Sequence, residues 1–473
     1  MGTASSEACD RTYDVIVVGA GVSGGFLADA LTEAGLRVAV LEAGRAYASN
    51  GYPKGELQAN AELYWGGGIE LTADARIGLL RARAVGGGSI VNQALLDRFD
   101  DDAFDSWQDA SGCEFLARAS LDPYYDRVAE RVHIERVPEE FRNGNADVFR
   151  DGFEANGYRS APLERAQRDC RFGDGNSCIV CLHGCPIESK QSTSVTVLRR
   201  AAAAGCTIVP QFLVERVSED RDGVEVSGQT PDGRRSVRGG ALVLAAGSLG
   251  NSRFLLQSDF GARLPALGHN FYTHPQFMNL GVYDEPVDSF RGPMQSYKSA
   301  DPGFRKRGFK LENVFTPPVS LAMLVPGFGP GHLDGMRKMR HFACIEVAVR
   351  DTEPGRIRLG PGGSTVVQKS MNDEDRARRE RGLDAIRNIF YSTGAKEIVE
   401  GEFAVGLHLM GGCNLGVDPA RSVVGPDFAL HGSRRIFAAD SSTFPNAPGI
   451  NPSYTIMALS LMAAERIVEE VGR

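Results

Sequence analysis

Three glycines and one acidic residue near the N-terminus have the spacing of a dinucleotide-binding site. Gly19, Gly21 and Gly24 directly follow an apolar run, and Glu42 ends the next apolar run along the chain. In this arrangement the first glycine permits a tight turn, the second lets the backbone approach a pyrophosphate, and the third allows close helix packing. The acid accepts hydrogen bonds from ribose hydroxyls. We predict a bound dinucleotide, and FAD rather than NAD, because a further strand of the same sheet comes only at residues 241–247.

A run of cysteines in the middle of the chain is a second candidate for chemistry. Cys178, Cys181 and Cys185 are separated by two and three residues, a proline follows, and Cys170 lies upstream. Thiolates at such spacings can hold an iron–sulfur cluster or zinc, and a cluster would pass electrons from a flavin to an external acceptor. The same run also fits a buried loop whose cysteines pack as small apolar groups, and we favour that interpretation. Spacing alone does not decide between them.

Composition excludes several classes of protein. The chain has 473 residues, 42% of them hydrophobic, and a formal net charge of −8, without a basic face interleaved with aromatics. These values argue against a nucleic-acid partner. No apolar run reaches the roughly 18 residues that span a bilayer. Nine cysteines without a secretory signal indicate a reducing compartment, so we expect a cytoplasmic protein.

The elements that must position these residues indicate an α/β domain at both ends of the chain. A strand at 13–18, a helix at 22–34 and a strand at 37–42 form a β-α-β unit. The stretch 97–168 is charged and partly helical with no strong strand signal. Short alternating strands and one charged helix at 373–392 indicate a second, mainly β domain. Strands are also expected at 207–209, 224–226 and 435–440, and a closing helix at 452–471.

A second glycine block, at residues 83–92, resembles the first signature of the glucose-methanol-choline (GMC) oxidoreductase family. The resemblance implies that FAD binds to this segment, with the ring and phosphates held by Gly87, Gly88, Ser89 and Asn92. Some members carry a histidine just before the asparagine and bond it covalently to the flavin. Here that position is Val91, so non-covalent FAD is expected.

Other segments extend the resemblance. The segment 246–252, with Gly247, is similar to the family's second nucleotide-contacting segment in the form found in bacterial cholesterol oxidases. Glu42 matches the ribose-binding acid, and Val214 matches the residue near adenine. Asp440 and Pro452 belong to the C-terminal segments that are implied to contact the cofactor.

The C-terminal match implies the catalytic pair. Residues 407–413 resemble the catalytic-histidine segment, with His408, and Asn451 stands where many members have a second histidine and cholesterol oxidases have asparagine. A histidine titrates near the pH at which it can accept a hydroxyl proton as hydride leaves carbon for flavin N5. Asn451 can only donate and accept hydrogen bonds, so it would orient the substrate oxygen. It would also contact the flavin beside the N-terminus of the closing helix.

These inferences predict an FAD-dependent GMC-type alcohol dehydrogenase or oxidase. His408 is the predicted base, and the substrate is a primary or secondary alcohol, with a sugar, amino sugar or polyol favoured. A sterol or aliphatic alcohol, and a flavin/iron–sulfur electron-transfer subunit, remain open, as does the acceptor, oxygen or a soluble carrier. The expected fold is a discontinuous Rossmann-like FAD domain and a mainly β substrate domain. The FAD domain is assigned residues 10–95, 190–275 and 402–473, and the substrate domain is assigned 96–189 and 276–401.

Overall fold

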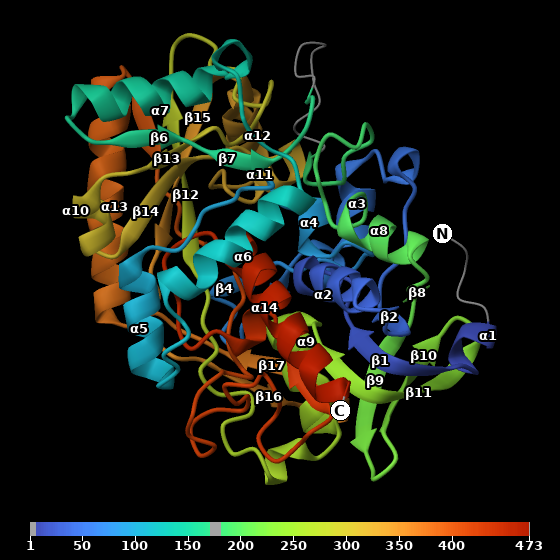
Figure 1. The fold of residues 1–473 in the computed structure, drawn as a ribbon. Coiled ribbons are helices and arrows are strands. Elements are labelled where there is room, and N and C mark those ends of the chain that lie inside the picture. The colour runs from blue at the N-terminus through green and yellow to red at the C-terminus, as the bar shows by residue number, and fades with distance from the viewer. Residues whose placement is uncertain (1–5, 171–180, 473) are drawn as a thin grey trace.

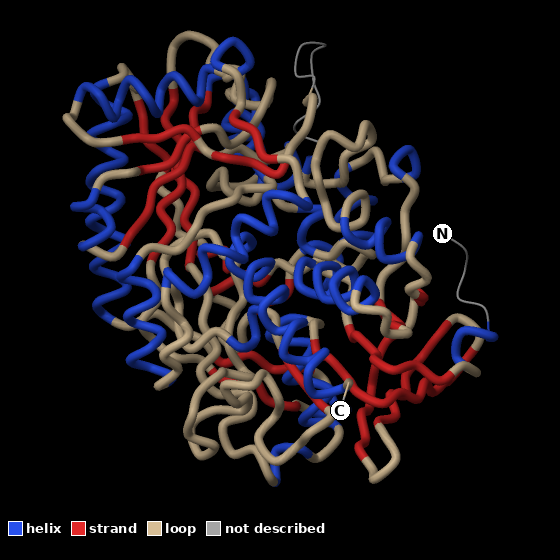
Figure 2. The backbone as a smooth tube through the Cα atoms, in the orientation of Figure 1, coloured by secondary structure: helices blue, strands red, loops and turns tan. Residues whose placement is uncertain are grey.

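The computed structural model describes residues 6–170 and 181–472. These residues form two large sheets and two small two-stranded sheets, with helices packed around them (Figure 1). The strands gather in two separate groups (Figure 2). The predicted combination of an α/β part and a sheet-rich part is confirmed. No helix among the described residues is long and apolar enough to cross a membrane.

The first sheet is the nucleotide-binding type predicted from the N-terminal motif. Its strands run in the order β8-β2-β1-β11-β10-β9, with β20 paired to β11. The pairs β8/β2, β2/β1, β1/β11 and β11/β20 are parallel, and β9, β10 and β11 form an antiparallel extension. The bounds are β1 Thr12–Val18, β2 Val38–Glu42, β8 Thr207–Pro210, β9 Leu213–Glu219, β10 Val224–Thr230, β11 Gly233–Leu244 and β20 Ile436–Ala438.

Helices cover this sheet and place glycine turns at its carboxyl edge. α2 (Val22–Glu33) packs against α8 (Val197–Ala203) and α14 (Ser453–Val471), and α14 packs against α6 (Arg118–Arg131). α9 (Gly247–Gln257) begins at the end of β11. The β1 strand is buried throughout its apolar run, as expected for a strand inside a parallel sheet. The predicted β-α-β unit and the closing helix are confirmed within one residue of their expected ends.

The second sheet forms the sheet-rich part of the molecule. Its strands run β3-β4-β19-β12-β15-β14-β13-β6, with β18 paired to β12. α7 (Gly144–Ala155) and α13 (Asp373–Ser392) pack on it and on each other, as Figure 1 shows. The bounds are β3 Glu70–Leu71, β4 Ile77–Leu79, β6 Ser160–Pro162, β12 Pro275–Val282, β13 Tyr297–Ser299, β14 Phe309–Asn313, β15 Phe342–Val349, β18 Glu397–Val399 and β19 Ala404–Gly406.

Two features of the fold concern the sequence-based expectations for strands and domain boundaries. The stretch 97–168 contains short strands, β5 (Ile134–Arg136), β6 and β7 (Glu164–Ala166), which are too short to produce an alternating pattern. β3 and β4 pair in the second sheet although they lie inside the segment 10–95 assigned to the FAD domain, and the domain boundaries stay a prediction. The remaining elements are α1 Ser6–Cys9, α3 Glu56–Leu63, α4 Gly88–Val91, α5 Asp101–Ser111, α10 Pro302–Lys306, α11 Pro318–Ala322, α12 Gly329–Arg337, β16 Arg356–Leu359 and β17 Thr365–Gln368.

Candidate active site

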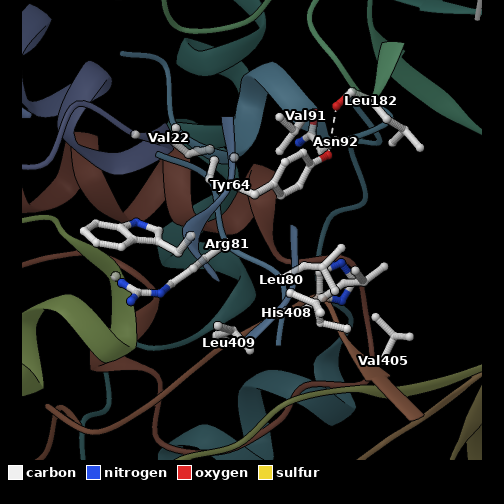
Figure 3. Close-up of a pocket in the computed structure, with 18 of the residues that line it drawn as sticks. Val22, Tyr64, Leu80, Arg81, Val91, Asn92, Leu182, Val405, His408 and Leu409 are labelled. Carbon is white, nitrogen blue, oxygen red and sulfur yellow. Dashed lines mark hydrogen bonds between the residues drawn. The ribbon is translucent and has the colours of Figure 1, made fainter. Parts of the chain in front are cut away.

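A cavity of about 700 Å³ is lined by residues of both sheets. Most of the residues predicted to contact a cofactor or substrate lie around it. They are Gly19, Gly21, Glu42, Gly87, Gly88, Asn92, Val214, Gly247, His408, Asp440, Asn451 and Pro452. Figure 3 shows part of this wall: His408 lies near Leu80, and Tyr64 lies near Val91 and Asn92 and donates to the carbonyl of Leu182. Residues more than four hundred positions apart in the chain therefore meet at one site.

The two glycine blocks pack against each other at the dinucleotide end of the cavity. A Cβ on Gly87 would lie 2.5 Å from Gly21 Cα, whereas a Cβ on Gly88 or Gly247 would meet no protein atom within 4 Å. Gly88 and Gly247 line the cavity, so side chains there would take up space that the described residues leave open. Close backbone approach on one side and open space on the other are what an extended dinucleotide requires, and the cavity fits FAD.

Gly24 and Ser89 do not line the cavity but hold its glycine turns together. A Cβ on Gly24 would lie 1.8 Å from the carbonyl oxygen of Gly19, so only glycine permits this packing of α2. The Ser89 hydroxyl donates to the carbonyl of Gly86 and lies 3.2 Å from the Thr193 hydroxyl. These two residues therefore shape the turns instead of facing a ligand.

Glu42 ends β2 at the position expected for a ribose-binding acid. Its Oε2 accepts from the backbone N–H of Ala20 at 2.9 Å, and its Oε1 accepts from that of Gly44 at 2.8 Å. Burial raises the pKa of this carboxyl, and the two backbone donors oppose that effect. The bonds orient the carboxylate, and each oxygen has a further lone pair for a hydroxyl donor.

Asp440 joins the end of β20 to the start of α9. Its Oδ2 accepts from the backbone N–H of Gly247 at 2.6 Å and from Asn251 Nδ2 at 3.0 Å. Its Oδ1 accepts from the N–H of Ser442. Burial raises the pKa of Asp440. The carboxylate therefore fixes the turn that precedes α9, where Gly247 faces the open space described above.

Asn92 is held by a buried lysine that the sequence analysis did not identify. Lys190 Nζ donates to the carbonyl of Asn92 at 2.9 Å and to those of Ile90 and Cys181. Asn92 Oδ1 accepts from the N–H of Ala94, which directs the side-chain amide. The lysine thus fastens the segment expected to hold the flavin to the loop that contains Cys181.

His408 is paired with a second histidine, His274, which the sequence analysis left unassigned. The two Nδ1 atoms lie 2.9 Å apart, and His274 Nε2 accepts from the backbone N–H of Gly449 at 2.9 Å. Burial and the nearby Lys310 charge lower the pKa of His408 to about 3. Burial, above all, also lowers the pKa of His274. Both rings are therefore neutral at physiological pH.

Asn451 is bound to an acidic cluster on the second sheet. Its Nδ2 donates to Glu312 Oε1 at 3.1 Å. Glu312 on β14 lies directly opposite Glu346 on β15, and both line the cavity. Burial and the neighbouring Glu312 raise the pKa of Glu346. The acids were missed because the residues of β14 and β15 carry no motif, and only the register of the two strands brings them together.

The N-terminus of α14 points toward the same end of the cavity. Pro452 is the residue before the first helical residue, and Asn451, Pro452, Ser453 and Ile456 line the cavity. A nineteen-residue helix carries a partial positive charge at its N-terminus. This charge favours an anionic group at the flavin end of the site.

Three of the four predicted metal ligands lie among the described residues. Cys178 lies outside the described residues. Cys181 is buried beside Val137, and Cys170 packs against the same small cluster. Cys185 accepts from the N–H of Lys190 at 3.4 Å, and burial raises the pKa of its thiol. Within residues 6–170 and 181–472, no group of three or more His, Cys, Asp or Glu side chains could hold a metal, so an iron–sulfur cluster has no support there.

Comparison with known proteins agrees with this geometry. Residues 60–276 and 353–460 match the N-terminal and C-terminal profiles of the GMC oxidoreductases. An uncharacterised GMC-type oxidoreductase of Mycobacterium tuberculosis is 29% identical over 97% of this chain and 76% of its own length. A long-chain-alcohol oxidase of Arabidopsis thaliana is 26% identical over 97% of this chain and 67% of its own length.

The fold is shared with solved structures as well. The crystal structure of pyridoxine 4-oxidase from Mesorbium loti has a TM-score of 0.73 at 18% identity, covering 96% of this chain and 99% of that one. The family match covers the second glycine block, at residues 83–92, and the C-terminal segment that carries His408. The chain therefore belongs to the GMC oxidoreductase family and is an FAD-dependent oxidoreductase.

Proposed function

We propose that this protein oxidises an alcohol to the carbonyl compound, with His408 and Asn451 binding the carbinol oxygen. The observation that carries the proposal is that both side chains line the cavity into which the dinucleotide-binding glycines also open. They are linked through the backbone, because Gly449, two residues before Asn451, donates to the partner of His408. Their arrangement supplies polar groups to a single oxygen.

FAD, when bound, supplies the hydride acceptor at N5. The residues that would hold it are the cavity-lining glycines of both blocks, Glu42, Asn92 and Asp440, with Val214 near the adenine. Non-covalent binding follows from Val91, which offers no nucleophile where other members carry histidine. The chain's own contribution to the chemistry is to bind the alcohol oxygen, orient the carbon and exclude water.

The substrate end of the cavity favours an alcohol with a hydrocarbon part. Its inner end carries Gln276, Gln295 and the two glutamates, but apolar side chains line most of the remaining wall. They include Met278, Val314, Phe315, Leu324, Val405 and Leu409. An apolar wall stabilises a hydrocarbon group by removing it from water. We therefore place an aliphatic alcohol ahead of the sugar, amino sugar or polyol favoured from composition.

The test is anaerobic bleaching of the purified flavoprotein. A panel of alcohols would include straight-chain alcohols of increasing length, a sterol, a polyol and an amino sugar. Loss of the flavin absorption bands with one class, at a rate that rises with chain length for aliphatic alcohols, is the expected result. If no alcohol bleaches the flavin while dithionite does, the proposal is wrong. Re-oxidation by oxygen or by a soluble carrier then identifies the acceptor.

A further inference from the structure

Two arginines are among the described residues that line the cavity, and they differ in their partners. Arg81 donates from Nη2 to Glu70 Oε1 at 2.9 Å, and its guanidinium lies 4.4 Å from the centre of the Trp65 ring (Figure 3). The Arg253 side chain forms no hydrogen bond or ion pair within residues 6–170 and 181–472. Its nitrogens are not among the enclosed polar atoms that lack a partner, so they keep accessible surface. Arg253 is therefore free to contact a ligand in the cavity.

Arg253 stands at the end of a smooth face of α9. Gly247, Gly250 and Arg253 are three residues apart on this helix and all line the cavity, so they share one side of it. A Cβ on Gly247 would meet no protein atom within 4 Å, and one on Gly250 would meet only the side chain of Ala246. A flat group can therefore lie along α9 as far as the guanidinium.

This part of α9 lies beside the end of the cavity expected to hold adenine. The backbone N–H of Phe212 donates to the carbonyl of Glu42 at 2.8 Å, so the start of β9, with Val214, adjoins the predicted ribose-binding acid. α9 packs against β9, and the N–H of Val217 on β9 donates to the hydroxyl of Ser258, the residue that follows the helix, at 2.9 Å. The ribose acid, the adenine-side strand and the arginine are thus neighbours.

The chemistry around Arg253 suits an aromatic ring better than a phosphate. Val214 and Phe254 line the same end of the cavity with apolar groups, whereas a pyrophosphate needs several N–H donors, which the turn at Gly21 supplies at the start of α2. Burial and the nearby charge of Arg81 lower the pKa of Arg253, but a guanidinium stays charged in proteins. A planar, weakly hydrated cation stacks well on the face of a base.

We propose that Arg253 stacks its guanidinium on the adenine ring of FAD and so helps the site to hold FAD in preference to FMN, which has no adenine. The contact is non-covalent and moves no proton. It adds one side-chain interaction to a dinucleotide end that otherwise depends on glycine turns. The inference concerns the cofactor and holds whichever alcohol the enzyme oxidises.

The experiment measures how fast FAD leaves the diluted holoenzyme, followed by the fluorescence of the released flavin. Arg253→Ala should release FAD about tenfold faster than wild type. Arg253→Tyr keeps a flat face without the charge and should stay within about twofold of wild type. Arg253→Lys keeps the charge without the flat group and should release FAD nearly as fast as the alanine variant. Arg263→Ala is the control, because Arg263 follows the same helix but does not line the cavity, and its release rate should be that of wild type.

The order of the variants distinguishes adenine from phosphate. If the lysine variant retains FAD and the tyrosine variant loses it, Arg253 binds the pyrophosphate and the proposal is wrong. Release at the wild-type rate from Arg253→Ala would show that the arginine does not contact the cofactor, which also overturns it. Phosphorus NMR of bound FAD gives a measurement without turnover. The two pyrophosphate signals should keep their wild-type positions in Arg253→Tyr, and a shift of either signal would assign the arginine to that phosphate instead.

Discussion

The two ends of the cavity are built by different means. The dinucleotide end depends on backbone, because glycine turns approach each other so closely that a Cβ on Gly24 would lie 1.8 Å from a carbonyl oxygen. The substrate end depends on side chains, with a histidine pair and a buried acidic pair brought together by strand register. A tightly packed glycine turn tolerates no side chain, whereas a side chain at the substrate end can be replaced without disturbing the backbone. The difference predicts that mutations at the first end abolish binding and those at the second change rates.

The largest effect should come from Gly24→Val. Its side chain would collide with the carbonyl of Gly19, which no rotamer relieves, so the first turn could not close. We expect protein without bound flavin, or no folded protein at all, measured as the ratio of flavin to protein absorbance and by thermal unfolding with added FAD. Gly35→Ala is the control. It has positive φ but open space around it, and should keep its flavin at a cost of about 1 kcal/mol.

His408→Asn should have the opposite effect from Gly24→Val: it should slow catalysis and leave flavin binding intact. The variant keeps a polar side chain and no glycine turn is touched, so FAD should remain bound. Asparagine is shorter than histidine, so the alcohol oxygen loses the ring nitrogen that binds it, and flavin reduction should fall by about 10² to 10³-fold, as for removal of one oxyanion-binding group. Anaerobic stopped-flow absorbance measures the rate. A variant that loses its flavin, or one that reduces at the wild-type rate, would contradict this division of labour.

The same contrast explains what could be predicted from the sequence. Gly19, Gly21, Glu42 and the first strands were found because a dinucleotide turn is a local pattern, with every part within one β-α-β unit. His408 was found only through a family resemblance. The strands β1 and β11 pair although more than two hundred residues separate them, and the parallel sheet was expected from their apolar runs.

The acidic pair and His274 could not be predicted. Glu312 and Glu346 meet because β14 pairs with β15 in one register, and a shift of one residue would turn both acids to the opposite face. Nothing near either residue in the sequence encodes that register. His274 stands beside Pro275 at the start of β12, and its role depends on a backbone N–H of a segment 175 residues away. For the two glutamates, the only local signal of a function was a polar residue within a buried strand.

The histidine pair should also make stability depend on pH. The pKa of His408 is about 3 in the folded protein and near 6.5 when unfolded, so the unfolded state binds more protons between these values. Stability therefore falls as pH drops from 6.5 toward 3, by at most about 2 kcal/mol at pH 5 from His408. His274 acts in the same direction. Urea unfolding at pH 5 and pH 7 should show a smaller difference for His408→Asn than for wild type, and an equal difference would contradict the neutral buried state.

The smallest effect should come from the hydrogen bonds that join α3 to α11 at the edge of the cavity. Glu56, at the start of α3, accepts from the backbone N–H groups of Val319 and Ser320, each at 2.7 Å, and from the Ser320 hydroxyl. Leu57, Val319 and Ser320 line the cavity, so these bonds hold its two edges together. Glu56→Gln loses one acceptor and the charge, which costs about 1 kcal/mol.

That cost should appear in substrate binding and not in the chemical step, because Glu56 touches neither histidine nor the acidic pair. We expect KM for the alcohol to rise about fivefold with kcat unchanged. Gln58→Ala, on the same helix, is the control; the Gln58 side chain donates to Glu62 of that helix, and the variant should leave both constants unchanged. A fall in kcat for Glu56→Gln would mean that these hydrogen bonds also position the reacting groups. The edge of the cavity and the catalytic end would then not be independent.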